Sequence, residues 1–337
     1  MSPARARTIA AVLCALTFAS MLYVGAGMHQ IEVTDLASLL QGADFAVPLL
    51  AILVAHELGH YVAGRIHGVE ISLPYFIPMP FTMLGTMGAV IQQNGEVERR
   101  DALLDVAAAG PLAGLCVALP VLIYGVATSP IALVSSFPDN TVVEGHSILY
   151  ALVLYALHGP IPEGSDIFLS STAFAGWAGL LLTMMNLLPV AQLDGGHVAA
   201  ALFGARQNRI GKIVLGLLPL AAIATSAYYG LTAYVAGARG ESLWNAIQSG
   251  FHWLYWFVLL LALGLYAGLE EPPAADATSS IGARWLAMAR RIGRGISLGL
   301  EHPPVGDAPL SPGRRVVAVL TLLLFVLLFM PSWIRLP

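Results

Sequence analysis

The sequence predicts an all-α polytopic membrane protein with about seven transmembrane helices and a short membrane-associated β-hairpin or re-entrant loop. Of its 337 residues, 57% are hydrophobic and only 11% are charged, and the mean hydropathy is +0.76. A soluble domain is about 45–50% apolar and about 25% charged. The net charge of −4 is small and gives no reason to expect nucleic acid as a partner. The expected surrounding is therefore the lipid bilayer.

Apolar runs of about 20 residues define the predicted spans, because a helix of that length crosses the hydrocarbon core. The first run, which follows Arg5 and Arg7, exceeds the apolar core of about 7–15 residues in a secretory signal peptide, so we expect an uncleaved span. Cys14 and Cys116 fall in apolar runs and are expected to be buried small side chains. The seven predicted spans cover residues 8–28, 45–64, 101–127, 171–190, 210–237, 245–268 and 314–333.

Basic residues predict the orientation of these spans, because Lys and Arg concentrate in cytoplasmic loops. Of the 16 Lys and Arg residues, all but Arg239 and Arg335 fall on the side that holds the N-terminus. The segment 128–170 has four acidic residues and no Lys or Arg, which places it outside. We therefore expect a multi-pass protein of the plasma membrane with a cytoplasmic N-terminus.

Two further segments are apolar but do not suit a span. Residues 73–92 contain three prolines, which argue against a continuous helix. Gly85 and Gly88 among Thr and Val favour a hairpin or re-entrant loop, which is tolerated at membrane depth only where protein or a cavity covers it. Residues 147–158 are expected to form a short interfacial helix on the outer side.

The motif His56-Glu57-Leu58-Gly59-His60 lies inside the second predicted span. Residues four apart share one face of a helix, so His56 and His60 can present two imidazoles to one metal ion. Glu57 can reach a metal-bound water and take its proton. Two surface histidines are the alternative interpretation, but ionisable groups inside membrane spans are costly and usually functional. The motif therefore predicts a metal site at membrane depth.

A catalytic zinc needs three protein ligands and one open position. Asp194 is one candidate for the third ligand, because a carboxylate directly after an apolar helix is hard to explain without a cation partner. His197 is the rival candidate, since imidazole also binds zinc. The other histidines lie mainly in loops or at span ends and are expected to be solvated or interfacial.

The two motifs together resemble the site-2 protease family of intramembrane metalloproteases. The family patterns HExxH and N-x-x-P-x-x-x-L-D-G are both matched in full, the second by Asn186, Pro189, Leu193, Asp194 and Gly195. A weaker resemblance, to the branch with plant plastid members and their prokaryotic relatives, favours a prokaryotic source. The similarity covers about residues 45–205, and its weaker parts are 74–78, 85–92 and 109–114.

The resemblance implies one Zn²⁺ per chain, held by His56, His60 and Asp194, with Glu57 as general base. It also implies transmembrane protein substrates that are cut within or near their spans, in regulated intramembrane proteolysis. Asn186 is expected to hold the substrate or the developing oxyanion, because its amide is a suitable donor. An interhelical hydrogen bond is the alternative role for Asn186.

Substrate binding is also expected at Gly85 and Gly88, within a strand edge to which an unwound substrate adds by backbone pairing. The alternative for this segment is a packing loop. Gly110 and Gly114 are spaced for close packing of the third predicted span rather than for chemistry.

The alternative function is a polytopic metal transporter that uses the same His and Asp cluster. Transport predicts ionisable residues along several spans and repeated halves, whereas here they cluster at one face and no repeat is visible. A catalytically dead scaffold is a third possibility, and the presence of Glu57 and of every ligand weighs against it. The sequence identifies neither the substrate nor the oligomeric state.

The chain divides by composition into five segments. The segment 270–313 is expected to be a cytoplasmic linker followed by a basic amphipathic stretch, which either lies on the anionic leaflet or is a solvated connector. The others are the first span with its outer loop (1–44), the catalytic membrane core with the zinc site (45–205), two further spans (206–269) and the C-terminal span (314–337).

Overall fold

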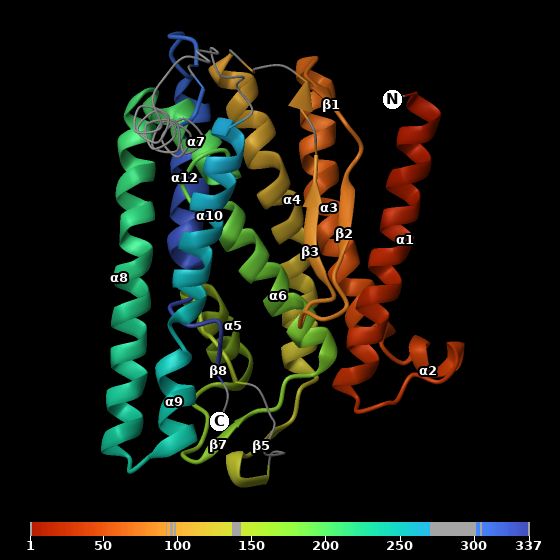
Figure 1. Cartoon of the computed structure of the whole chain (residues 1–337), viewed down its shortest axis with the longest axis vertical. Coiled ribbons are helices and arrows are strands. Elements are labelled where there is room, and N and C mark those ends of the chain that lie inside the picture. The colour runs from red at the N-terminus through yellow and green to blue at the C-terminus, as the bar shows by residue number, and fades with distance from the viewer. Residues whose placement is uncertain are drawn as a thin grey trace, which may run out of the picture.

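The computed structural model describes residues 2–91, 93–94, 97, 99–136, 143–269, 301–303 and 305–335, and it is mostly helical (Figure 1). Long helices run side by side along the longest axis of the molecule. The helices are α1 (Pro3–Met28), α2 (Leu36–Leu40), α3 (Ala43–His67), α4 (Arg100–Ala127), α5 (Ile148–His158), α6 (Ser171–Asn186), α7 (Asp194–Phe203), α8 (Arg206–Val235), α9 (Gly240–Gln248), α10 (Phe251–Leu269) and α12 (Pro312–Leu328), with a 3₁₀ turn at Val134–Ser136.

Four of the described helices, α1, α3, α4 and α8, are long and apolar enough to cross a membrane. The helices α9 and α10 meet at a bend of 44° and form a fifth candidate, as one broken span or a re-entrant loop. The other two predicted spans are shorter than expected, because α6 has 16 residues and α12 has 17. The structure therefore supports a helical membrane protein with four or five candidate spans, and the number seven is not confirmed.

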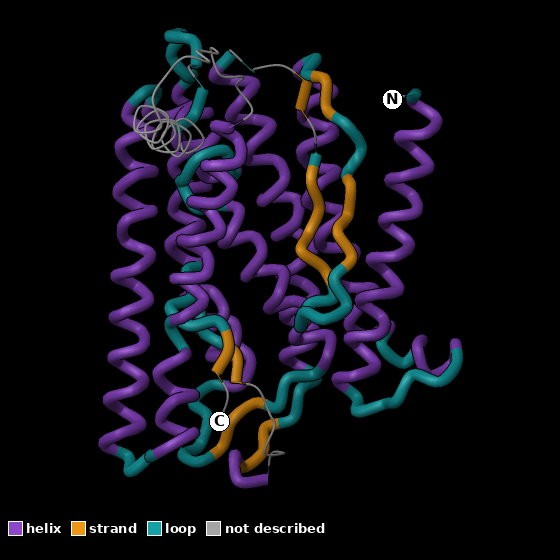
Figure 2. The backbone as a smooth tube through the Cα atoms, in the orientation of Figure 1, coloured by secondary structure: helices purple, strands orange, loops and turns teal. Residues whose placement is uncertain are grey.

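Four two-stranded antiparallel sheets accompany the helices, and the longest of them, β2–β3, runs alongside the middle of the bundle (Figure 2). The strands β2 (Tyr75–Pro78) and β3 (Thr86–Val90) form the predicted hairpin, with an irregular register between Phe76 and Pro78. The sequence analysis did not predict the other three sheets. They pair β1 (Glu70–Ile71) with β4 (Gln93–Asn94), β5 (Ile131–Leu133) with β7 (Ser165–Ile167), and β6 (Val143–Glu144) with β8 (Ile334–Arg335).

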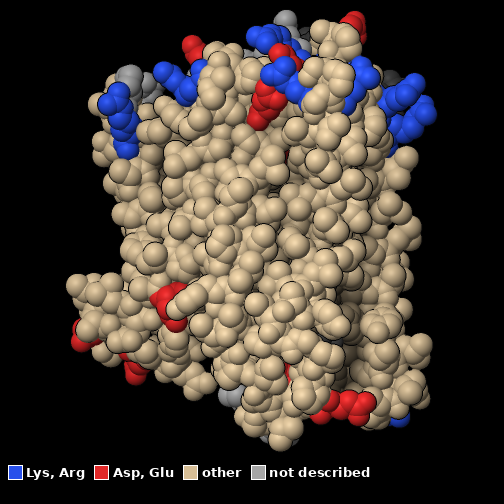
Figure 3. All heavy atoms as spheres, turned by 180° about the vertical axis from the view of Figure 1, so that it is seen from behind, with Lys and Arg blue, Asp and Glu red and all other residues tan. Residues whose placement is uncertain are grey.

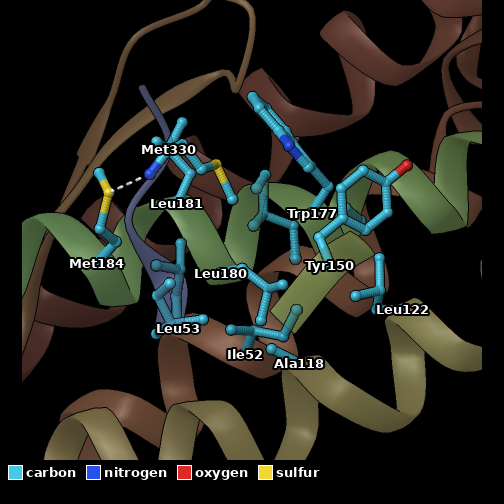
Figure 4. Close-up of a cluster of buried hydrophobic side chains, with 14 of the residues drawn as sticks. Ile52, Leu53, Ala118, Leu122, Tyr150, Trp177, Leu180, Leu181, Met184 and Met330 are labelled. Carbon is cyan, nitrogen blue, oxygen red and sulfur yellow. Dashed lines mark hydrogen bonds between the residues drawn. The ribbon is translucent and has the colours of Figure 1, made fainter. Parts of the chain in front are cut away.

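A continuous apolar core joins α3, α4, α5 and α6 with the end of α12. Figure 4 shows Ile52 of α3 near Ala118 of α4 and Leu180 of α6, and it shows Met330 beside Leu181 and Met184. Trp177, Leu180 and Met184 of α6 are fully buried here. The backbone N–H of Met330 donates to the sulfur of Met184 at 3.3 Å. This packing holds α3 and α6 against each other, and the two helices carry the first and second motifs.

Charge is distributed unevenly along the molecule (Figure 3). Lys and Arg gather, with some acidic groups, at the end where α1, α4, α7 and α12 begin, while the opposite end is mainly acidic. A broad band between the two ends is almost free of charge on the face shown. This pattern fits a molecule inserted in a bilayer, with its two charged ends in the aqueous phases on either side.

The proposed five-segment division remains a prediction. Most of the segment that was predicted to be a cytoplasmic linker with a basic amphipathic stretch, residues 270–300, lies outside the described residues. Residues 301–303 and 305–311 are described and form an extended connection that leads into α12.

Candidate metal centre

The helix α3 places His56 and His60 one turn apart on the same face, in the C-terminal half of the helix. His56, Glu57 and His60 are all buried. The helix ends at Gly68, whose φ of 70° gives the left-handed C-cap that glycine favours. The sequence prediction that two imidazoles share one face is therefore confirmed.

Asp194 begins α7 after a short irregular connection from α6. In this connection Ala191 has a φ of 50°, which turns the chain back toward α3. Gly195 and Gly196 follow, and a Cβ at either position would collide with backbone carbonyl oxygens of Leu187 or Ala191. The Asp-Gly-Gly sequence is thus required for the first turn of α7 to pack against the connection that precedes it.

The three candidate ligand atoms form a nearly equilateral triangle. The Nε2 atoms of His56 and His60 are 3.1 Å apart, and each is 3.3 Å from Oδ2 of Asp194. Two ligands that each lie about 2.0–2.1 Å from a tetrahedral zinc are separated by roughly 3.3 Å. Within the described ranges these residues form the one group of three or more His, Cys, Asp or Glu side chains close enough to hold a metal ion.

The protonation of the two imidazoles also suits a cation. The Nδ1–H of His60 donates to the carbonyl oxygen of Val106 at 2.8 Å, which leaves Nε2 of the neutral ring as an acceptor. The side-chain amide of Asn186 donates to Nε2 of His56 at 3.2 Å, so that atom is also an acceptor. With both rings in these neutral forms, three acceptor atoms, including a carboxylate oxygen, face one another. A bound cation resolves this arrangement, and the donor set fits zinc.

Glycines of α4 make room for the two imidazoles. A Cβ at Gly110 would overlap the ring of His60, including Nε2, and a Cβ at Gly114 would press on His56. In α3, a Cβ at Gly59 would meet the backbone of Ala109. The sequence analysis predicted close helix packing from Gly110 and Gly114 and missed that the groups packed there are the metal-binding rings.

His197, the rival third ligand, lies elsewhere. Its Nδ1 atom is 2.7 Å from Nε2 of His302, and Nδ1 of His302 is 2.7 Å from the carbonyl oxygen of Pro303. Because that carbonyl can only accept, the neutral His302 ring accepts from His197. Burial, and after it the neighbouring His302, lowers the pKa of His197 to about 4, which keeps its ring neutral at physiological pH. Asp194 therefore completes the group of three, and His197 pairs with His302.

An ion-pair network joins three helices at the basic end of the molecule, beside the site. Asp105 of α4 accepts from Arg314 of α12 at 2.6 Å, and it is 2.9 Å from Nε2 of His67 in α3. The next residue of α4 is Val106, which binds His60 through its carbonyl. The sequence analysis missed this network. A signal for His67 existed, because it follows His60 by two helical turns on the same face.

The hairpin that carries Gly85 and Gly88 packs against α1. The hydroxyl of Ser20 donates to the carbonyl oxygen of Gly85 at 2.6 Å. Gly88 has a φ of 90°, and its N–H donates to the hydroxyl of Thr86 at 3.0 Å. The expected strand is therefore present, but the N–H of Gly88 is already bonded within it. Gly88 provides a bend in the strand rather than a free donor.

The fold and the site together define an integral membrane protein with a buried, zinc-compatible His-His-Asp centre. The family model described as Peptidase family M50 matches residues 44–217, and the chain belongs to this family. This finding confirms the resemblance to the site-2 proteases, and the matched region contains both motifs.

Relatives with known names agree with this assignment. The chain is 32% identical over 190 residues to "Probable zinc metalloprotease EGY2, chloroplastic" of Oryza sativa subsp. indica, covering 56% of this chain and 34% of that protein. It is 33% identical over 183 residues to the corresponding EGY1 of Arabidopsis thaliana, covering 52% and 33%. The EGY3 protein of Oryza sativa subsp. indica is 26% identical over 260 residues, covering 69% and 37%. The chain thus spans about a third of the length of these relatives. No solved structure matches it.

Proposed function

We propose that this chain is an intramembrane zinc metalloprotease that hydrolyses peptide bonds within or near transmembrane segments of protein substrates. The observation that carries the proposal is the triangle of acceptor atoms from His56, His60 and Asp194, with edges of 3.1–3.3 Å, within a bundle of membrane-length helices. One zinc per chain is held by these three residues. The names of the relatives, probable zinc metalloproteases, support the same activity.

Glu57 is the general base in this proposal. When bound, zinc polarises the scissile carbonyl and lowers the pKa of a water molecule. Glu57 is 6% exposed, follows His56 directly and lies outside the ligand group, so its carboxylate is free for proton transfer. It accepts the proton of the attacking water and passes it to the leaving amine.

Asn186 orients the substrate. Its amide contacts Nε2 of His56, the lone pair of which is needed by the metal, so the amide is released when the site is loaded. A released amide donor at the edge of the ligand triangle is placed to bind the carbonyl oxygen of the scissile bond or the oxyanion that develops from it. The interhelical hydrogen bond, which was the alternative, is the contact between Asn186 and His56 itself.

The strand β3 binds the unwound substrate by backbone pairing. Its residues Met87 and Val90 are exposed, and Gly85 and Gly88 shape the turn and the bend. Ala89→Pro removes an N–H from this strand while leaving the zinc ligands in place. We expect that variant to retain zinc and to cut a model transmembrane peptide slowly. Normal cleavage by both Ala89→Pro and Val90→Pro would show that β3 is a packing element.

Glu57→Gln tests the activity itself. Purified protein is mixed with a model transmembrane peptide that contains Gly, Asn and Pro near its cytoplasmic end, because such a helix unwinds at lower cost. We expect Glu57→Gln to retain zinc and to lose cleavage by about 10²–10⁴-fold. Glu70→Gln is the matched control, since Glu70 is exposed on the same side. A transporter would instead keep much of its metal flux in Glu57→Gln, and cleavage near the wild-type rate would refute the general base.

The proposal also includes regulated intramembrane proteolysis as the function, seven membrane spans, and a prokaryotic plasma membrane as the location. The basic end supports a cytoplasmic N-terminus, whereas the names of the relatives assign those proteins to the chloroplast. Reporter fusions at Arg99 and Glu163 should score cytoplasmic and external, respectively. A cytoplasmic score at Glu163 would overturn the topology. Comparison of membrane-protein fragments in cells with wild-type protein and with Glu57→Gln would identify substrates.

A further inference from the structure

A cavity of about 220 Å³ lies at the basic end of the molecule, away from the metal ligands. Three elements that are distant in sequence form it. They are the start of α4 with Arg100, the end of α7 with residues 201–203, and the entry into α12, with Pro309 and Leu310 before the helix and Arg315 in its first turn. Its walls are apolar except for the two guanidinium groups. Its position at the end of α7 matters, because Asp194 lies at the other end of the same helix.

The two arginines of the cavity differ from their neighbours in charge pairing. Arg99 pairs with Asp101 at 2.7 Å, and Arg314 pairs with Asp105 at 2.6 Å. Arg100 and Arg315, the next residues in each case, form no ion pair with any acidic residue in the described ranges. The first member of each Arg-Arg pair is thus neutralised by α4, and the second lines the cavity without an acidic partner among the described residues.

The local structure holds the two guanidinium groups in place. The Nε–H of Arg315 donates to the carbonyl oxygen of Leu310 at 3.1 Å. Gly204, with a φ of 60°, ends α7 directly under Arg100, and a Cβ there would collide with the guanidinium. The Nε atom of Arg100 is buried and has no hydrogen-bond partner in the described structure. A buried charged donor without a partner is costly, so an acceptor is expected in the cavity.

We propose that this cavity binds a phosphate group, with Arg100 and Arg315 as its ligands. A planar guanidinium matches a phosphate with two parallel hydrogen bonds. The apolar wall formed by Leu202, Phe203 and Leu310 accommodates the hydrophobic part of an amphiphile. Two sources share this chemistry, an anionic phospholipid of the adjacent leaflet and a soluble phosphate monoester. Either ligand joins α4, α7 and α12 and thereby stabilises the helix that carries Asp194.

Binding to the purified full-length chain tests the proposal. The probes are phosphatidylglycerol, measured as bound adducts by native mass spectrometry, and glycerol phosphate, measured by the shift of the thermal unfolding midpoint. We expect Arg100→Gln/Arg315→Gln to weaken binding of the phosphate compound by about tenfold or more, because two charge-assisted contacts are lost. Arg206→Gln/Arg209→Gln is the control, since it removes the same charge from exposed positions at the start of α8 that do not line the cavity.

The two probes distinguish an anionic phospholipid from a soluble phosphate compound as the ligand. Binding of phosphatidylglycerol without a response to millimolar glycerol phosphate identifies a lipid site, and a comparable response to both identifies a site for soluble phosphate compounds. The proposal is overturned if neither probe binds wild-type protein, if the double variant binds as wild type does, or if the control loses as much. Should the double variant fail to fold, Arg315→Gln alone decides, because Arg315 is exposed, and unchanged binding in that variant also overturns the proposal.

Discussion

Two buried clusters with histidine lie along α7, and they differ in what their nitrogen atoms face. In the metal centre, Nε2 of His56, Nε2 of His60 and Oδ2 of Asp194 are acceptors that point at a common centre. In the second cluster, His197 donates to His302, and His302 donates to the carbonyl oxygen of Pro303. In the first cluster all three atoms are acceptors, so none of them donates to another. In the second cluster each N–H donor meets an acceptor.

This difference shows that burial and proximity alone do not make a histidine a metal ligand. Both clusters have imidazoles within hydrogen-bond distance of each other, at 3.1 Å and 2.7 Å. The groups that surround each cluster determine whether its ring nitrogen atoms donate or accept. Val106 and Asn186 occupy the positions that force both Nε2 atoms of the first cluster to be acceptors, while Pro303 sets the direction of a hydrogen-bond chain in the second.

Removal of a metal ligand should give the largest effect. In His56→Ala, His60→Ala or Asp194→Ala we expect the zinc content of purified protein to fall from about one per chain to near zero, because three protein ligands are the minimum of a catalytic site. Metal analysis after detergent purification measures the content. A chelator such as phenanthroline should inhibit the wild-type protein for the same reason.

The matched control is His197→Ala, which should retain zinc. If Asp194→Ala kept its zinc and His197→Ala lost it, His197 would be the third ligand. The roles assigned to the two clusters would then be wrong. Partial occupancy in both variants would equally contradict the assignment of one role to each cluster.

A substitution at Gly110 should give the next largest effect, although Gly110 touches no metal. A Cβ at this position of α4 would overlap the ring of His60, so Gly110→Ala must displace the imidazole or the helix. We expect zinc affinity to fall by at least about 10–100-fold, the range found when a group that orients a ligand is lost. Equilibrium competition with a chromophoric chelator measures it.

Gly216→Ala is the control for helix effects, since a Cβ at Gly216 of α8 would meet no atom within 4 Å. Alanine also favours a helix more than glycine does, so neither variant should lose helix content. Wild-type zinc affinity in Gly110→Ala would mean that α3 and α4 separate easily at the site, and the close packing would then have no role in holding His60.

The sequence predicted the parts of this structure that depend on local patterns. The long apolar runs gave α3 and α4 to within a few residues, and the i, i+4 spacing placed His56 and His60 on one face. The predicted fourth span, 171–190, was too long because the chain leaves the helix after Asn186. It turns at Ala191, where a non-glycine residue adopts a positive φ. That turn brings Asp194 to α3, and no periodicity reveals it.

Contacts between distant segments could not be predicted from local patterns. His302 reaches His197 across 105 residues, and Arg314 reaches Asp105 across 209. His302 and Arg314 each look like a solvated residue of a loop or span end when only their neighbours in the chain are considered. Their partners depend on how the connection before α12 crosses the end of α7, which is decided by tertiary packing.

The smallest predicted effect tests most directly whether the two clusters act independently. In His302→Ala the buried Nδ1–H of His197 loses its acceptor, which should lower the free energy of unfolding by about 1–3 kcal/mol. His302→Gln retains a carbonyl oxygen near that position and should recover part of the loss. Denaturant titration in detergent, followed by the fluorescence of the six tryptophans, measures the change. Zinc content should remain at the wild-type level in both variants, because neither the ligand atoms nor Val106 and Asn186 are altered. Loss of zinc from His302→Ala at a temperature where the protein stays folded would show that the second cluster supports the metal centre, and the two would then be one functional unit.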